Sequence, residues 1–363
     1  MCLQGECHSL FFFTTKEVKV LIVTLHNLFH QQEGGDNLME VNQSDRCLQF
    51  SCPQRSVSPF YVLLYLCVAA VVLLTVCGNL LIIISVCHFK QLHTPTNMLI
   101  LSLAVSDFLV GLFVMPFHLS RMIESCWIFG ISVCLFYYLI SFFVTSISIY
   151  NVALIAVDRY FAISNPFLYI EKVSVSKMCI VILSMWIFLM SYNSTLLYFN
   201  GTSTGLIMCP EQCLFVLHEV CSLIDLVLVF VVPCSAIILF YALVFVIARK
   251  HATAIREINV QSKGSKSMAD SMKTERKAAK VLSILVAVFL ACLFPYFVCA
   301  TVSNAIESQS FPNFVILLYL NSTINPMIYA LFYPWFRKCI KIIFTLQIFK
   351  TGSALINVMS NNS

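Results

Sequence analysis

Two aspartates lie inside otherwise apolar stretches of the sequence, Asp107 in "LSLAVSDFLVG" and Asp225 in "CSLIDLVLVFVVPC". A charged side chain at the centre of a lipid-embedded helix costs about 2.5–3.5 kcal/mol on insertion scales, so such residues are functional by default. Hydroxyl and amide groups occur in other apolar stretches at Ser148, Asn321 and Asn325. Because these groups cannot all face lipid, we predict that they meet inside a helix bundle.

The set Asp107, Ser148, Asn321 and Asn325 has two interpretations. One is a hydrogen-bond network that only holds helices together. The other is a sodium or water site whose occupancy is coupled to a conformational change. We favour the second interpretation for this set, and the first for Asn79 taken alone.

The elements that must position these groups follow from composition. Of the 363 residues, 60% are hydrophobic and only 11% are charged, whereas about a quarter are charged in a soluble domain. A run of about 20 apolar residues crosses a membrane, and only helices satisfy their own backbone there. We therefore predict an all-α membrane protein with a seven-transmembrane helix bundle. The seven runs are Phe60–Cys87, Met98–Leu119, Ile131–Ile163, Val173–Leu197, His218–Ala248, Ala278–Asn304 and Phe311–Phe332.

Basic residues predict the orientation. Lys and Arg crowd residues 249–277 and 337–341, whereas the opposite loops carry mainly Arg121. The positive-inside rule then puts the N-terminus outside and the C-terminus in the cytoplasm of a plasma-membrane protein. The net charge of +5 is explained by this asymmetry, and no nucleic-acid patch is indicated.

We divide the chain into an extracellular segment 1–58, a seven-transmembrane bundle 59–335, and an amphipathic helix with a cytoplasmic tail 336–363. Residues 1–38 are interpreted as a gene-model extension. The stretch "FYPWFRKCIKII" predicts a short cytoplasmic amphipathic helix, in which Cys339 is a candidate for palmitoylation, with an unmodified cysteine as the equal alternative. Sequons on the outer side predict glycans at Asn42 and Asn200.

The chain has 17 cysteines, most of them single residues inside apolar runs. There are no Cys-x-x-Cys pairs, so a metal site is not expected. Five cysteines on the oxidising outer side predict disulfides. They are Cys47, Cys52, Cys134, Cys209 and Cys213.

From Phe60 to Lys350 the sequence resembles rhodopsin-like (class A) G-protein-coupled receptors. The matching motifs, in order, are "GN" in span one, "LAVSD" in span two, "DRY" after span three, Trp186, Pro233, "FxxCxxP" in span six and "NPMIY" in span seven. The stretch "NSTINPMIYALFYPWF" is similar to the span-seven signature of trace amine-associated receptors. This resemblance implies a receptor for small amines in olfactory neurons. It also implies coupling to a stimulatory or olfactory G protein that raises cyclic AMP, binding of arrestin, and an allosteric sodium ion near Asp107.

The resemblance also implies two disulfides. One joins Cys134 to Cys213 in the second outer loop. The second joins Cys209 to the extracellular segment, and we assign it to Cys52, with Cys47 as the rival.

A two-state switch is a further implication of the resemblance. Arg159 is expected to pair with Asp158 and, across the bundle, with Glu275, although Glu275 is also interpretable as one charge of a solvated turn. Opening releases Arg159 toward Tyr241, while Tyr329 closes behind it. The other expected switch residues are Tyr160, the packing triad Phe289, Ile149 and Pro233, the hinge Pro295, and Leu293, which stands where the family has Trp.

The binding acid departs from the usual pattern of amine receptors. They carry an aspartate in span three, eighteen residues before the arginine of "DRY", and this position is Ser141 here. Asp225 lies eight residues before Pro233, about 12 Å along a helix, at the depth of a ligand pocket. A subset of the family, mostly in fish, is similar in carrying its acid on span five. We therefore interpret Asp225 as the amine-binding residue, with a structural, hydrogen-bonded aspartate as the alternative.

Four aromatic residues are expected to form the pocket walls around Asp225, because aromatic faces suit a cation. They are Phe142, Tyr296, Phe297 and Tyr319. No nucleophile–base pair or phosphate loop indicates an enzyme. Two alternatives remain: a receptor of the same fold for a non-amine ligand, and a membrane transporter that uses Asp107 and Asp225 as a cation path.

Overall fold

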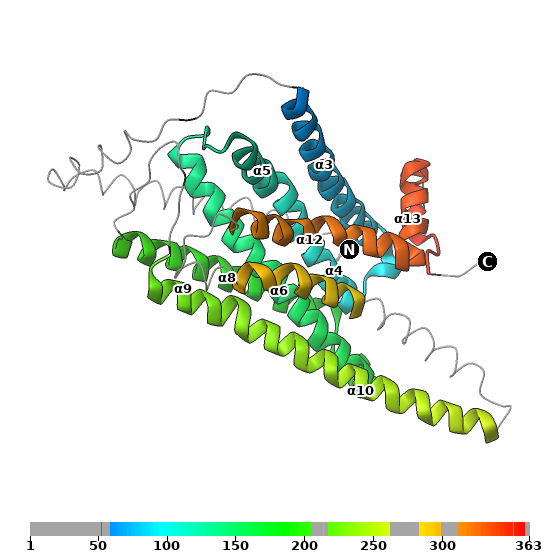
Figure 1. Cartoon of the computed structure of the whole chain (residues 1–363). Coiled ribbons are helices and arrows are strands. Elements are labelled where there is room, and N and C mark those ends of the chain that lie inside the picture. Colours follow the sequence, from blue (N-terminus) through cyan, green and yellow to red (C-terminus); the bar gives the residue numbers. More distant parts are fainter. Residues whose placement is uncertain are drawn as a thin grey trace.

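The computed structural model describes Cys52, residues 59–204, Cys213, and residues 217–261, 283–298, 311–350 and 352–359. The regular structure of these residues is helical throughout. Six helices are long and apolar enough to cross a membrane, and Ser283–Val298 is a shorter apolar helix between the fifth and the last of them. The long helices lie side by side as one bundle (Figure 1). The predicted all-α, seven-helix class is therefore confirmed.

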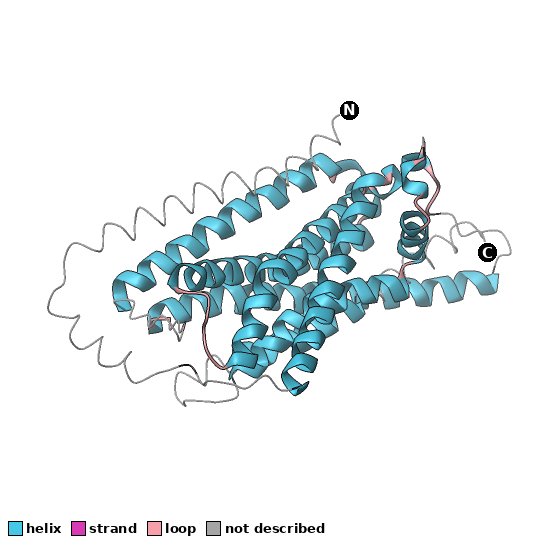
Figure 2. Cartoon of the chain, turned by 90° about the horizontal axis from the view of Figure 1, so that it is seen from above, coloured by secondary structure: helices cyan, strands magenta, loops and turns pink. Residues whose placement is uncertain are grey.

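Each predicted span corresponds to a helical segment. The first, third, fourth and seventh are α3 (Pro59–His88), α6 (Ile131–Ser164), α8 (Val175–Thr204) and α12 (Phe311–Phe332). The second consists of α4 (Pro95–Leu109) and α5 (Met115–Glu124), and the fifth of α9 (Glu219–Asp225) and α10 (Val232–Gln261). Two short helices, α7 (Pro166–Lys172) and α13 (Pro334–Phe344), follow the third and seventh spans. Seen from above, several helices cross the bundle at an angle (Figure 2).

Local sequence explains where several helices begin. The hydroxyl of Thr94 accepts a hydrogen bond from the backbone N–H of Asn97, and Pro95 occupies the first turn of α4. Prolines also stand in the first turns of α7 and α13. A proline there loses nothing, because the first N–H groups of a helix have no intrahelical partner.

Spans two and five each contain a π-helical segment, at Val110–Val114 and Leu226–Val231. Each segment ends just before a proline, Pro116 or Pro233. Proline has no N–H and disturbs the regular hydrogen-bond ladder, so the preceding turns widen. Asp225 is the residue immediately before the wide segment of span five.

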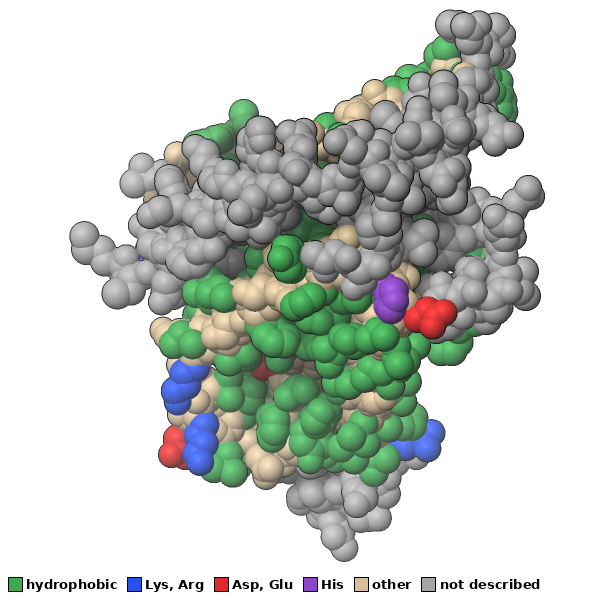
Figure 3. Space-filling model, turned by 90° about the vertical axis from the view of Figure 1, so that its left-hand side faces the viewer, with side chains coloured by type: hydrophobic (Ala, Val, Ile, Leu, Met, Phe, Trp, Pro, Cys, Tyr) green, Lys and Arg blue, Asp and Glu red, His purple; other side chains and the backbone are tan. Residues whose placement is uncertain are grey.

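The outer surface of the bundle is apolar. Figure 3 shows one face on which hydrophobic side chains dominate the described region, with Lys and Arg along its lower edge.

The helix α13 packs against α3, and Cys339 is 0% exposed on the buried side of α13. The thiol of Cys339 therefore faces protein and not the outside, which favours the unmodified cysteine over palmitoylation.

We predict that Gly78→Val destabilises the bundle. An added Cβ at Gly78 would lie 2.9 Å from Cβ and Cγ of Pro326, and overpacking of this kind costs about 1–3 kcal/mol. The melting temperature of the purified receptor should fall, and less receptor should reach the cell surface. The neighbouring Cys77, which is exposed, provides the control Cys77→Val, which should change neither quantity. A Gly78→Val protein as stable as wild type would contradict this packing.

Candidate functional site

Asp225, at the end of α9, faces the interior of the bundle. Its side chain is 8% exposed, whereas its neighbours Leu223 and Ile224 are exposed. The hydroxyl of Tyr192, on α8, donates a hydrogen bond to Oδ1 of Asp225 over 3.2 Å. Sequence reasoning missed Tyr192, although a tyrosine inside span four ("MSYNST") was a signal that a polar partner was needed there.

Two of the predicted wall residues lie on the side of the acid. Phe297 is buried and stacks on Phe230 of span five, with ring centroids 4.3 Å apart. Tyr296 meets Phe297 edge to face at 5.0 Å and is within electrostatic range of Asp225. The wide segment of span five and the helix Ser283–Val298 are thus joined by aromatic contact beside Asp225.

The other predicted wall residues belong to a second group between spans two, three and seven. Tyr319 is buried and lies next to Ser141 and Tyr137. His118 Nδ1 is 2.9 Å from the hydroxyl of Tyr137, and the His118 ring meets Tyr319 edge to face at 5.1 Å. Sequence reasoning included neither His118 nor Tyr137 in the pocket. Ser141 therefore lies among hydroxyl and imidazole groups.

A disulfide attaches the second outer loop above these residues. Cys134 at the top of α6 is bonded to Cys213, with a Cα–Cα distance of 5.7 Å, the pair that the family resemblance implies. Tyr138 donates from its hydroxyl to the carbonyl of Cys213 over 2.9 Å. The Tyr138 ring centroid lies 6.5 Å from that of Phe142, the remaining predicted wall residue.

The second expected disulfide is wrong. Cys52 is bonded to Cys126, in the turn after α5, with a Cα–Cα distance of 5.6 Å. Cys52 is therefore attached to the turn after α5, and it is not available for Cys209. Cys209 and its rival partner Cys47 lie outside the described residues.

The predicted glycan at Asn200 is also contradicted. Asn200 is 1% exposed in the last turns of α8, and its Oδ1 accepts a hydrogen bond from the backbone N–H of His218 over 2.7 Å. The amide connects spans four and five, so it is not presented as a surface acceptor. Asn42 lies outside the described residues.

The polar groups predicted to meet at mid-depth converge on Asp107. Ser322 donates to Oδ1 over 2.8 Å, and Asn325 donates to Oδ2 over 2.7 Å. Ser148 lies 3.4 Å from Oδ1. Asn79 donates instead to the carbonyl of Ser322 over 3.0 Å, which agrees with its interpretation as a residue that holds spans one and seven together.

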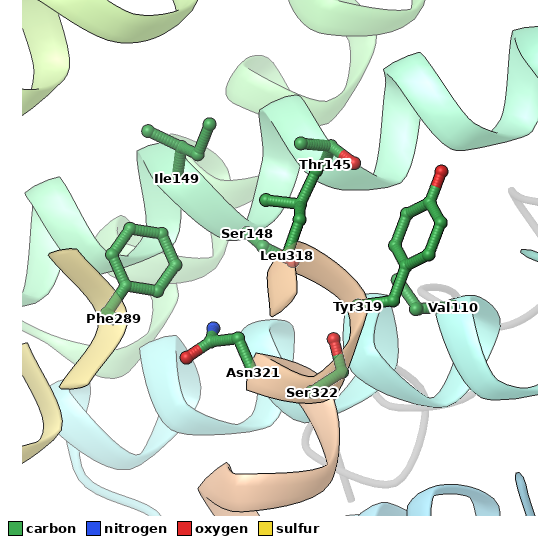
Figure 4. Close-up of a pocket in the computed structure, with 9 residues that line it drawn as sticks. All are labelled: Val110, Thr145, Ser148, Ile149, Phe289, Leu318, Tyr319, Asn321 and Ser322. Carbon is green, nitrogen blue, oxygen red and sulfur yellow. The ribbon is translucent and has the colours of Figure 1, made fainter. Parts of the chain in front are cut away.

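A small cavity adjoins this cluster between α6, α12 and the helix Ser283–Val298 (Figure 4). Ser148, Asn321 and Ser322 line one part of the cavity, and Ile149 and Phe289 line another. Its volume of about 20 Å³ exceeds the roughly 10–15 Å³ that one water molecule needs. Among the described residues, the buried Oδ1 atoms of Asn321 and Asn325 have no hydrogen-bond partner. The carboxylate, the hydroxyls and these free oxygens fit a small hard cation or water.

At the opposite end of the bundle, Asp158 and Arg159 form an ion pair of 2.6 Å. Thr96 of α4 donates to Oδ2 of Asp158 over 2.7 Å and also contacts Arg159. Tyr169 of α7 donates to Oδ1 of Asp158 over 2.5 Å. Burial and the Asp158 carboxylate raise the pKa of Tyr169 to about 12, so its hydroxyl remains a donor at neutral pH. Sequence reasoning included neither Thr96 nor Tyr169.

The other residues expected to form the switch lie on several helices of the bundle. The hydroxyls of Tyr241 and Tyr329 are buried, and neither has a hydrogen-bond partner among the described residues. The Tyr160 ring lies beside Phe240, with centroids 5.3 Å apart. Glu275 lies outside the described residues. Phe289, Ile149, Pro233 and Leu293 are buried, and Pro295 is half-buried.

The same helices thus connect a buried acid beneath a disulfide-attached outer loop with an ion pair at the other end. An apolar bundle with a buried acid toward one end and an ion pair toward the other is an arrangement expected of a membrane receptor. The sequence model of the family described as 7 transmembrane receptor (rhodopsin family) matches residues 78–329 of this chain. The chain therefore belongs to the rhodopsin family of seven-transmembrane receptors.

Curated relatives support this membership. Trace amine-associated receptor 13c of Danio rerio is 38% identical over 306 residues, which cover 82% of this chain and 89% of that receptor. Trace amine-associated receptor 8a of Rattus norvegicus is 40% identical over 328 residues, covering 85% and 94% of the two chains. These relatives are receptors, so the chain belongs, within the rhodopsin family, to the trace amine-associated receptors. It is therefore not an enzyme, and the transporter alternative is wrong.

We predict that Tyr169→Phe raises signalling in the absence of ligand. The change removes the donor to Asp158 and thereby weakens the contact of α7 with the Asp158–Arg159 pair. A hydrogen bond to a charged group contributes about 1.5–3 kcal/mol, so basal activity should rise several-fold at matched surface expression. Glu171→Gln changes an exposed charge on the same short helix and should leave the baseline unchanged. Equal baselines for both variants would contradict a resting role for Tyr169.

Proposed function

We propose that this chain is a receptor for small organic amines, that their ammonium group binds Asp225, and that binding activates a stimulatory or olfactory G protein that raises cyclic AMP. The observation that carries the proposal is a buried carboxylate with an unmatched charge. Among the described residues, Asp225 has the neutral hydroxyl of Tyr192 as its hydrogen-bond partner and forms no ion pair. A buried charge is costly unless a partner compensates it, and an ammonium ligand provides that partner.

The surroundings of Asp225 suit such a ligand. Tyr296 lies near the acid, and Phe297 and Phe230 continue the aromatic group from Tyr296; aromatic faces attract cations. The trace amine-associated receptors that share 38–40% of their residues with this chain support the amine as ligand class. Ser141 replaces the usual acid of span three, so Asp225 takes its role, as in the fish-type subset.

The cytoplasmic partners dock on the opposite end of the bundle. Phe167 of α7 is 88% exposed, and we assign it to an apolar contact with the G protein. Arrestin binds the same activated face. The receptor is oriented in the plasma membrane with residues 1–58 outside, where Asn42 carries a glycan, and with α13 and the tail in the cytoplasm.

We predict that Asp225→Asn lowers amine potency by at least about two orders of magnitude, roughly 3 kcal/mol for a lost buried charge pair. The variant keeps the shape and the hydrogen bond to Tyr192 but removes the charge. Potency is measured as the amine concentration that gives half-maximal cyclic AMP in cells expressing the receptor. Glu219→Gln is the matched control, because Glu219 is an exposed acid on the same helix α9.

If Asp225→Asn responds to amines as wild type does, the carboxylate is structural and the amine proposal fails. A receptor of the same fold for a non-amine ligand would then be the better interpretation. If Glu219→Gln loses as much potency as Asp225→Asn, the effect is one of general surface charge and the proposed contact also fails.

We further propose that a sodium ion binds at Asp107 and stabilises the resting arrangement. The support is the cavity lined by Ser148, Asn321 and Ser322, next to a carboxylate that receives bonds from spans three and seven. An ion there favours the arrangement in which these spans are close. An agonist that favours the other arrangement must then compete with it, because coupling between two sites is reciprocal.

We predict that replacing potassium chloride by sodium chloride at equal ionic strength lowers agonist potency about five- to tenfold. The measurement is agonist-stimulated nucleotide exchange on the G protein in isolated membranes. Asp107→Asn should abolish the difference between the two salts. A sodium effect that persists in Asp107→Asn would place the ion elsewhere.

A further inference from the structure

We infer that Tyr192 is a specificity-determining residue. Its hydroxyl occupies one oxygen of Asp225 and leaves a single carboxylate oxygen for the ligand. N-alkylated amines are therefore accepted alongside primary amines. The inference rests on the proposed function, and it concerns the selectivity of that site. It starts from the 3.2 Å bond between the Tyr192 hydroxyl and Oδ1 of Asp225.

The acid is held from two neighbouring spans. Tyr192 of α8 bonds its side chain, and Tyr150 of α6 donates to the carbonyl of Leu228 over 2.9 Å. Leu228 lies in the wide segment that begins directly after Asp225. The carbonyls of a π-helical segment are displaced from the regular ladder, so a hydroxyl that binds one of them also fixes the local path of the helix. The position of the carboxylate is therefore set before any ligand arrives.

The bond from Tyr192 divides the two oxygens of Asp225 between protein and ligand. A phenol hydroxyl is neutral, so it satisfies Oδ1 and leaves the negative charge in place. Among the described residues, Oδ2 accepts no hydrogen bond, and it is the atom that remains for an ammonium. Tyr296, whose ring is near the acid from span six, is an aromatic neighbour for the alkyl groups on the nitrogen.

One available oxygen makes the number of N–H groups on the ligand less important. A tertiary ammonium has one N–H and can satisfy Oδ2 as well as a primary ammonium does. A primary ammonium has three N–H groups and gains from a second free oxygen, which Tyr192 denies to it. Removal of the hydroxyl should therefore favour primary amines over tertiary ones.

The test compares primary aliphatic and arylethyl amines with their N,N-dimethyl derivatives in the cyclic AMP assay. In Tyr192→Phe, the potency of each primary amine relative to that of its dimethyl derivative should rise about tenfold over the wild-type ratio, mainly through a stronger response to the primary amine, which gains the freed Oδ1. Tyr198→Phe is the matched control, because Tyr198 is an exposed tyrosine on the same helix, and its ratio should equal that of wild type. Tyr192→Met, which also lacks a donor, replaces Tyr192→Phe if that variant does not reach the cell surface.

The outcomes separate this inference from the proposed function. If the ratio in the Tyr192 variant equals the wild-type ratio while Asp225→Asn abolishes the response, Tyr192 is structural, and the amine site stands. A uniform loss for both compounds of each pair also overturns the inference. If the wild-type receptor responds to none of the pairs, the proposed function fails, and this inference fails with it.

Discussion

A polar group buried between these helices is costly unless it finds a partner inside the protein, because lipid offers no hydrogen bonds. The rest of the structure depends on this constraint. At mid-depth it brings spans two, three and seven together on Asp107 through Ser148, Ser322 and Asn325. At the end of the bundle that carries α7, it gathers Thr96, Arg159 and Tyr169 on Asp158. Each carboxylate thereby determines which helices are in contact at its depth. The apolar residues between the carboxylates pack together but do not select a particular neighbour.

The two intramembrane acids satisfy the constraint to different degrees. Asp107 accepts from three side chains, whereas Asp225 accepts from Tyr192 alone within the described residues. A carboxylate with three donors holds its surroundings in place and suits a small ion that exchanges with water. A carboxylate with one neutral donor keeps both its charge and an open oxygen, which is the condition for binding an organic cation. The difference in the functions proposed for the two acids follows from the number of donors and not from the residue type.

Much of this arrangement was predictable because membrane insertion leaves a strong signal in the sequence. The seven helices followed from apolar length, and the convergence on Asp107 followed from the cost of buried polar groups. The errors share a physical cause, since each concerned a contact between segments distant in sequence. Nothing in the spacing of Cys52 and Cys126 or in the Asn200 sequon says which partner lies nearby in space. Tyr192 and Tyr169 were missed because a tyrosine in an apolar or loop segment has several uses, and only the fold shows which carboxylate its hydroxyl meets.

Because Leu293 has no large ring, the contact between spans five and six becomes more important for transmitting movement to span six. Phe230 lies within the wide segment that begins after Asp225, and it stacks on Phe297 at 4.3 Å. Phe297 is one helical turn beyond Leu293 and therefore on the same face of its helix, and Pro295 between them weakens the backbone ladder. A ligand shifts an equilibrium only by the difference in its affinity for the two arrangements. A wide turn is a place where a helix can repack at small cost. In the proposed function, an ammonium bound to Asp225 acts on this turn, whose Phe230 contacts span six. The acid, the wide turn and the aromatic stack form one continuous series of contacts from the pocket to the hinge.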